Sequence, residues 1–411
     1  MIQSLIIYPL IFSTISIDKG GYEFVGGFYE TSVGLLFPTV IVFALTMLHS
    51  KKQKWNFQEV KFLFVCIVIA FIYSYFTPLN ASHQATTIGL IFFLQIFIVI
   101  YICKTYITGN QLVEALYDGL KIALWVEFLI SVSYSIFGIY AIQTLFYSDA
   151  ESEEWIREGT NIRRAYGTFG QPNRLGGFCA LIYIFYLSCN LLNYHRRTSL
   201  YLAAISMFTI LLSQSRSALF ASVMSSFFLY VVVLYKKGIR VRKLMIGVII
   251  LCIMGLAALQ LSIVRDMLFK SDVEEMEEAR FMHYIMGWDI LRMNHYMGVG
   301  MNAHVPYMLY KYPNMFGEFF NTRPIHNLHL GIFVETGLVG FLAWVYFLVS
   351  RIRKVLVTPM KKMNAPVLWF TYMGMLLIIL IHGFTDLVYL HYQCLLIVMF
   401  VGAFYTTKKP M

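Results

Sequence analysis

The stretch RPIHNLHLGIFVETGLVGFLAWVYFL, residues 323–348, joins a polar beginning to a long apolar run. The run over 327–350 is long enough to cross a bilayer as one helix, since such a helix needs about 20 apolar residues. His326 and Asn327 stand where the chain would enter the membrane. The stretch therefore predicts a membrane helix with two polar side chains at its beginning.

The composition of the whole chain also predicts a membrane protein. Of its 411 residues, 59% are hydrophobic and only 13% are Asp, Glu, Lys or Arg, and its mean hydropathy is +0.67. A soluble domain carries about 25% charged residues, and a water-soluble fold of this size could not cover its surface with so little polarity. Strong hydrophobicity with low charge also excludes a disordered chain.

We predict an all-α polytopic membrane protein with about twelve transmembrane helices. The predicted spans are 2–17, 32–48, 62–79, 85–103, 118–140, 173–194, 198–212, 217–235, 243–262, 327–350, 365–382 and 386–405. With the N-terminus in the cytoplasm, 20 of the 32 lysines and arginines fall on the cytoplasmic side, as expected for inner loops. Both termini are then cytoplasmic, and two long loops, 141–172 and 263–326, lie outside.

The second outer loop contains a stretch with helical spacing of apolar residues. Over 273–296, Tyr284, Ile285, Trp288 and Leu291 could share one face. A helix with one apolar and one polar face is typical of a segment lying in the membrane interface. We therefore expect an amphipathic helix within this loop.

Arginines gather at the predicted outer face, where an arginine needs a partner, water or an anion. The segment AYGTFGQPNRLGGF, residues 165–178, contains Arg174 and directly follows Arg164. Pro172 suits the first turn of a helix, whose free N–H groups can bind an anion. The segment is either a phosphate site or a helix cap with snorkelling arginines.

Two further arginines have similar alternatives. Arg216, within LLSQSRSALF at 211–220, is held among serines and can bind a diphosphate in a bidentate manner, or simply anchor the chain at the interface. Arg280 lies early in the expected amphipathic helix. It is available to an anion, or it pairs with Glu277 on the same helix.

His326 is the candidate proton acceptor. A neutral imidazole near pH 7 can take a proton from a hydroxyl, although a single histidine at a membrane surface is also an ordinary interfacial residue. Asp386, which follows HGFT, could orient the histidine or an arginine, or cap a helix. Glu127 lies inside an apolar span, and the sequence offers no reason for this intramembrane acid.

Taken together, three motifs resemble a known family. TFGQPNRLGGF, LLSQSRSALF and GVGMN followed by PIHNLHLGIFVETGLVGFL, in this order, resemble the O-antigen ligase and polymerase superfamily. These are bacterial membrane glycosyltransferases of the GT-C type with a large periplasmic loop. The resemblance covers roughly residues 160–400. It implies N-terminal transmembrane helices over 1–160 and a catalytic membrane region over 161–405 that includes the periplasmic loop 263–326.

The resemblance also implies a reaction and its residues. The donor is a glycan on undecaprenyl diphosphate, and neither a metal nor another cofactor is needed. His326 corresponds to the catalytic base, and the other implied residues are four diphosphate-binding arginines and two supporting residues: Arg216, Arg280, Arg164 and Arg174, with Asp386 and Asn327. The expected partners are the lipid-linked oligosaccharide, membrane lipids and a chain-length regulator protein, without nucleic acid. The expected location is the bacterial inner membrane, with the active site facing the periplasm.

Three activities remain as alternatives. An O-antigen polymerase is our first prediction, because each distinct surface glycan tends to need its own polymerase. The alternative within the family is an O-antigen ligase that transfers the glycan to lipid A–core. A lipid-linked glycan flippase is a further alternative, but a transporter should have charges lining a cavity near the midplane and broken helices in both halves, whereas here the charges gather at the outer face.

Overall fold

The structure is a computed structural model that describes residues 61–106, 109–139, 163–238, 274–312, 324–387 and 392–405. Within these residues it contains eleven α-helices and no β-strand. Nine of the predicted spans coincide with a helix, and the other three, 2–17, 32–48 and 243–262, lie outside the described residues. The all-helical class is confirmed for the part described, while the count of twelve and the division near residue 160 stay predictions.

The helices are α3 (Lys61–Phe76), α4 (His83–Tyr106), α5 (Gly109–Ser135), α6 (Pro172–Leu191), α7 (Arg196–Ser213), α8 (Arg216–Lys236), α11 (Glu274–Met293), α12 (His304–Lys311), α13 (Leu328–Val357), α14 (Pro366–His382) and α15 (Tyr392–Phe404). By length and composition, α6, α8 and α13 can each cross a membrane, and α14 is a shorter apolar helix. The last predicted span began at 386, but Asp386 and Leu387 are not helical, so Asp386 lies after the turn that follows α14.

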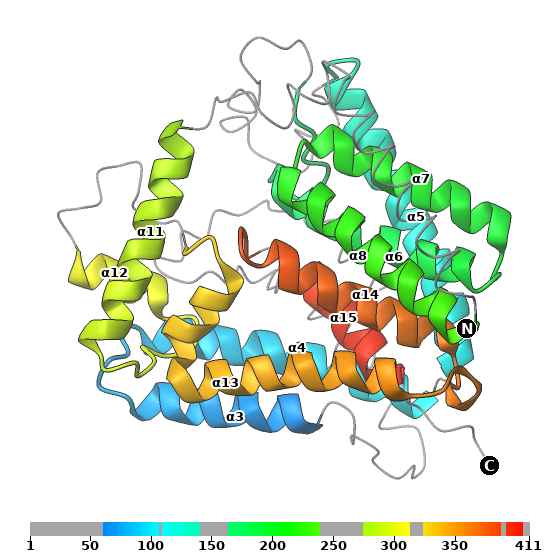
Figure 1. The fold of residues 1–411 in the computed structure, drawn as a ribbon. Helices are drawn as coiled ribbons and strands as arrows, with labels where there is room; N and C mark the ends of the chain where they lie inside the picture. Colours follow the sequence, from blue (N-terminus) through cyan, green and yellow to red (C-terminus); the bar gives the residue numbers. More distant parts are fainter. Residues whose placement is uncertain are drawn as a thin grey trace.

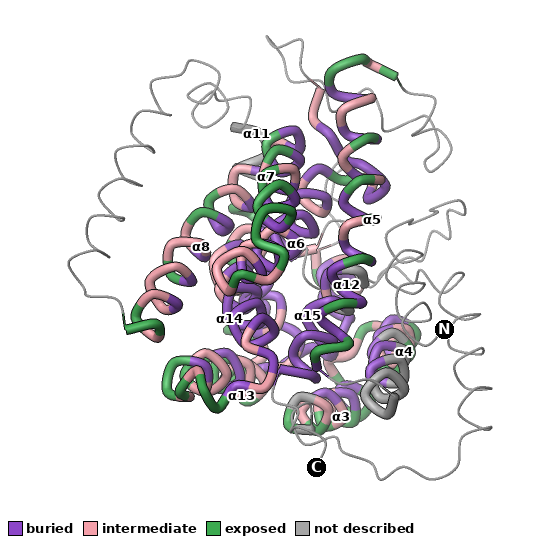
Figure 2. The backbone as a smooth tube through the Cα atoms, turned by 90° about the vertical axis from the view of Figure 1, so that its right-hand side faces the viewer, coloured by how far each residue is buried: buried purple, intermediate pink, exposed green. Residues whose placement is uncertain are grey.

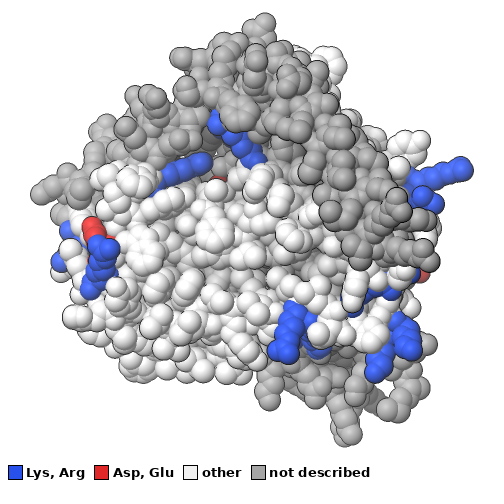
Figure 3. Space-filling view, viewed as in Figure 1, with Lys and Arg blue, Asp and Glu red and all other residues white. Residues whose placement is uncertain are grey.

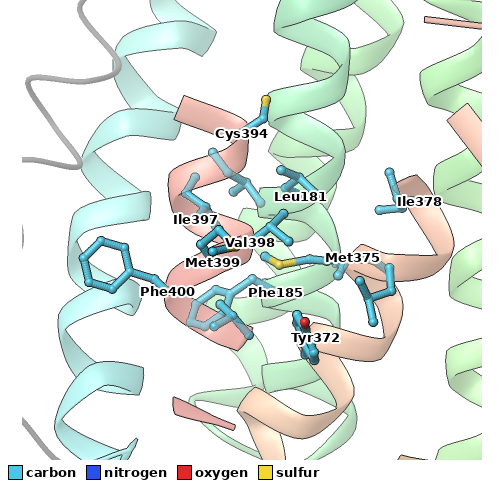
Figure 4. Close-up of a cluster of buried hydrophobic side chains, with 14 of the residues drawn as sticks. Leu181, Phe185, Tyr372, Met375, Ile378, Cys394, Ile397, Val398, Met399 and Phe400 are labelled. Atoms are coloured by element: carbon cyan, nitrogen blue, oxygen red, sulfur yellow. The ribbon is translucent and has the colours of Figure 1, made fainter. Parts of the chain in front are cut away.

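The core is built around α6, which packs against α7, α8 and α14. Figure 2 shows buried residues concentrated in α6, α14 and α15. A helix that is apolar on all sides belongs in the interior, and α6 has this composition. Leu181 and Phe185 of α6 meet Met375 of α14, and Phe400 belongs to the same cluster on the other side of α15 (Figure 4). This core fixes the beginning of α6 relative to the turn after α14.

A break in α13 occurs at Gly337, whose φ of 68° and ψ of −172° are not helical. The segment 296–300 fits against the break, and a Cβ at Gly298 would lie 2.2 Å from the Glu335 carbonyl oxygen. Backbone hydrogen bonds join the two: Val299 N to Val334 O, Gly300 N to Glu335 O and Leu338 N to Tyr296 O, each 3.0 Å. Irregular backbone inside a membrane protein needs such partners, so the glycines of the GVG motif allow this close approach.

The expected amphipathic helix is present as α11, but its buried face differs from the predicted one. Figure 1 shows α11 running across the end of α13, against which it packs. Met286, Ile290 and Leu291 form the buried side, while Ile285 is 38% and Trp288 46% exposed. The predicted face was therefore partly wrong. Helix α13 packs on the side of α11 that carries Met286 and Ile290, whereas Ile285 and Trp288 stay partly exposed.

Candidate functional site

His326 lies directly before α13, at the end of the molecule where α11 crosses. Asn327 is the N-cap of α13, since its Oδ1 accepts a hydrogen bond of 3.0 Å from the N–H of Leu330. The next N–H, of Leu328, donates to the carbonyl oxygen of Gly383 at 2.7 Å. The side chain of Asn327 thus caps the first turn of the helix, while its supporting role in the chemistry stays a prediction. These two hydrogen bonds fix the backbone on which His326 stands.

Asp386 faces His326 from the turn after α14. Its Oδ1 lies 3.9 Å from His326 Nδ1, an ion-pair distance that is too long for a hydrogen bond. The same oxygen accepts a 2.7 Å hydrogen bond from the N–H of Leu387, and Oδ2 accepts one of 2.8 Å from Asn173 Nδ2. The carboxylate is therefore held by two donors and turned toward the imidazole.

The charge state of Asp386 follows from its neighbours. Burial acts to raise the pKa of this carboxyl, but His326, His382 and Arg280 together outweigh burial. The pKa of Asp386 lies well below its usual value, because positive charge nearby favours the carboxylate. Asp386 is thus ionised at neutral pH and able to stabilise a protonated imidazole.

Helix α11 packs against the segments that carry His326 and Asp386. The hydroxyl of Tyr284 donates to the carbonyl oxygen of His326 at 2.9 Å and approaches that of Phe384 at 3.3 Å. The ring of His283 lies 6.3 Å from the ring of His326, centroid to centroid. Arg280, one turn before Tyr284, acts electrostatically on both Tyr284 and Asp386. The structure therefore brings Arg280, His326 and Asp386 into one neighbourhood.

The other three arginines are carried by two segments that touch each other. The N–H of Ala165, next to Arg164, donates to the carbonyl oxygen of Leu212 at the end of α7, at 2.9 Å. In the first turns of α6, a Cβ at Gly176 would lie 2.7 Å from the Cβ of Ser215. The segments that carry Arg164, Arg174 and Arg216 therefore contact one another: the chain before α6, the beginning of α6 and the α7–α8 turn.

The hydrogen bond from Asn173 to Asp386 links the arginine-bearing segments to the histidine side. Arg174 follows Asn173 directly in the first turn of α6. Figure 3 shows basic side chains around a hollow between α11 and the helices α7 and α8, with acidic atoms visible at its floor. Arg174, Arg216 and Arg280 are each half-buried, which is typical of charged groups at the edge of a recess.

Glu127 now has a structural explanation. It is fully buried in α5 and accepts hydrogen bonds from the backbone N–H of Thr168, at 2.9 Å, and from the Thr168 hydroxyl. A Cβ at Gly167 would lie 2.1 Å from Glu127 Oε2, so the turn passes directly over the carboxyl. This acid fixes the turn between Arg164 and Arg174.

An apolar cavity of about 150 Å³ lies among α3, α13, α14 and α15. Leu328, two residues after His326, is one of its lining residues. Glu335 is one of its few polar lining residues and is hydrogen-bonded to His304 Nδ1 at 2.6 Å. The cavity therefore offers hydrocarbon surface immediately next to the His326 segment.

Sequence reasoning missed three residues of this region. Asn173 lay within a quoted motif, but nothing in the sequence pointed to its contact with Asp386, 213 positions later. Tyr284 was noted only as an apolar face residue, and His283 carried no signal beyond being a histidine in the loop helix.

Among the described residues, no group of three or more His, Cys, Asp or Glu is arranged to hold a metal ion.

These features define an integral membrane protein, helical throughout its described residues, that assembles a histidine, a carboxylate and several arginines at one end of its helices. A family model described as O-antigen ligase matches residues 201–345 of the chain. The match confirms, over these residues, the resemblance to the O-antigen ligase and polymerase superfamily of membrane glycosyltransferases. A search of curated proteins found no similar sequence. The matched residues include Arg216, Arg280 and His326 but not Arg164, Arg174 or Asp386.

Proposed function

We propose that this protein transfers a glycan from undecaprenyl diphosphate to a hydroxyl group of an acceptor sugar. The observation that carries the proposal is the His326–Asp386 pair, 3.9 Å apart, with Arg280 in the same neighbourhood. A base beside cationic groups suits a reaction that deprotonates a hydroxyl and releases an anion. The proposal includes a bacterial inner-membrane location, cytoplasmic termini and a site open to the periplasm.

In this reaction His326 is the base. Its Nδ1 faces Asp386, so Nε2 is the nitrogen available to the acceptor hydroxyl. As the hydroxyl oxygen bonds to the anomeric carbon of the donor, its proton moves to the imidazole. The ionised Asp386 then stabilises the imidazolium across 3.9 Å.

The arginines act on the leaving group. The bond from the anomeric carbon to the phosphate oxygen breaks, and the diphosphate gains negative charge that cationic groups stabilise. We assign this role to Arg216 and Arg280, with Arg164 and Arg174 as further diphosphate contacts from the neighbouring segments. Attack on the side opposite the diphosphate inverts the anomeric configuration. The apolar cavity that Leu328 helps to line supports a donor carried on a hydrocarbon chain.

The acceptor separates two candidate activities. A polymerase, our first candidate, adds the growing glycan to another lipid-linked repeat unit, in the cell assisted by a chain-length regulator. A ligase, the second candidate, transfers the finished glycan to lipid A–core, and the matching family model supports both activities equally. Lipopolysaccharide from a deletion strain distinguishes them. Core capped with a single repeat indicates a lost polymerase, and long lipid-linked chains without core attachment indicate a lost ligase.

The test of the proposed chemistry is His326→Ala, expressed in the deletion strain. Removal of a general base lowers the rate about a hundredfold to ten-thousandfold, so glycan transfer should fall to background while the protein still inserts in the membrane. His195→Ala is the matched control, since His195 is exposed at the N-cap of α7. A normal glycan product from His326→Ala would refute the proposal.

A further inference from the structure

Asn173 contacts Asp386 but has no role in the proposed reaction as described so far. It lies in the first turn of α6, and its Nδ2 donates to Asp386 Oδ2 at 2.8 Å. The other oxygen of the same carboxylate accepts the N–H of Leu387 at 2.7 Å and faces His326 Nδ1 at 3.9 Å. Each carboxylate oxygen thus accepts one hydrogen bond. The positions of the two donors determine which oxygen faces the imidazole.

The two donors differ in what they can fix. The Leu387 N–H comes from the residue next to Asp386, so it moves with the turn. Asn173 belongs to a different element, 213 positions away in the chain. An ionised carboxylate that is only 10% exposed needs hydrogen bonds to replace lost water. Asn173 is therefore the donor that ties the carboxylate of Asp386 to the rest of the protein.

Helix α6 is a firm support for this contact. Pro172, at the start of the helix, has a restricted backbone φ. One turn on, Gly176 packs so closely on the α7–α8 turn that a Cβ would lie 2.7 Å from Ser215. Leu175 is fully buried. Close packing on both sides of position 173 leaves its backbone little freedom to move.

We infer that Asn173 is a positioning residue that acts through Asp386 on the imidazole of His326. This inference rests on the proposed role of His326 as the base. Since Arg174 follows Asn173, one helical turn carries both the support for the base and a proposed diphosphate contact. The beginning of α6 thereby sets the separation between the proton acceptor and the leaving group.

The first test compares Asn173→Ala with Asn190→Ala. Asn190 is at the opposite end of the same helix and donates a hydrogen bond of equal length, 2.8 Å, to the Arg196 carbonyl oxygen. The substrate is lipid-linked glycan extracted from the deletion strain, and the assay measures released undecaprenyl diphosphate. Asn173→Ala should lower kcat about tenfold to a hundredfold, the range for a hydrogen bond to a charged group. The donor KM should change little, and Asn190→Ala should behave as the parent.

The second test is Asn173→Asp, whose effect should depend on pH. Two carboxyls at hydrogen-bond distance cannot both ionise. A protonated Asp at position 173 can donate to Asp386 as Asn173 does, whereas an ionised one repels it. The other charged or titratable groups acting on Asp386 are His326, His382 and Arg280, with Tyr284 nearby on α11. They are common to both proteins, so the variant-to-parent rate ratio removes their own titrations.

The ratio for Asn173→Asp should rise as the pH is lowered from about 8.5 to 5.5, while the ratio for Asn173→Ala stays low throughout. A role confined to folding would give no such recovery. Full kcat in Asn173→Ala, or a pH-independent ratio for Asn173→Asp, would overturn the inference alone. Full activity of His326→Ala would instead overturn the proposed function on which it rests.

Discussion

Glu127→Ala tests whether a buried acid supports the diphosphate-binding segments. Glu127 has no exposed surface, and its carboxyl accepts both the N–H and the hydroxyl of Thr168. Thr168 belongs to the turn that leads into α6, between Arg164 and Arg174. The substitution removes the acceptor for two donors without touching any residue assigned to the chemistry.

The size of the effect follows from these two contacts. Leaving a buried donor without its acceptor costs about 1–3 kcal/mol. Two such donors predict a loss of about 2–6 kcal/mol in the free energy of unfolding. The turn would also lose its attachment to α5, so the affinity for the donor should fall because Arg164 and Arg174 are no longer held in place.

The assay is equilibrium unfolding of the purified protein in mixed micelles, together with the donor KM from released undecaprenyl diphosphate. Glu127→Gln is the first comparison, because its amide oxygen still accepts one of the two hydrogen bonds. Thr168→Val is the second, since it removes only the hydroxyl donor. The expected order of stability is parent, then these two variants, then Glu127→Ala. A Glu127→Ala protein within about 0.5 kcal/mol of the parent would refute this reasoning.

Three further predictions concern other positions. Arg216→Lys should raise the donor KM about tenfold, because lysine keeps the charge but loses the bidentate geometry, and Arg216→Ala should raise it further; the release assay at varied donor concentration measures both. Gly176→Val should lower the free energy of unfolding by about 1–3 kcal/mol, measured in the same micelles, because its Cβ would lie 2.7 Å from that of Ser215. Asp386 has a pKa well below its usual value, so it adds stability above its unfolded pKa of about 4 that is lost as the pH falls through the lower folded value. Thermal unfolding at varied pH should therefore show Asp386→Asn less stable than the parent at pH 7, with the difference shrinking below about pH 4.

The helix positions were largely predictable because hydropathy is a local property of the chain. The predicted span 173–194 became α6, Pro172–Leu191, and the predicted 365–382 became α14, Pro366–His382. The last span was less accurate at its beginning, since Asp386 and Leu387 are not helical. Asp386 and the turn around it belong to the apolar run in the sequence but not to the helix.

The side-chain partners were not predictable to the same degree. Glu127 and Thr168 are 41 positions apart, and no periodicity relates them. The face of α11 was predicted from spacing alone, but α13 decides which side is buried. For Asp386 the sequence left three alternatives open, namely orienting His326, orienting an arginine or capping a helix, and only the packing places it 3.9 Å from His326.

The sequence by itself determined that this is a membrane protein built on apolar helices, and which polar residues stand out from that apolar background. It did so because a membrane helix needs about 20 apolar residues in a row, a condition that can be checked locally. Only the tertiary structure decided that Asn173, His326 and Asp386 meet, and that the arginine-bearing segments lie against one another. Such meetings depend on how distant helices pack, and packing depends on the shapes of both partners together.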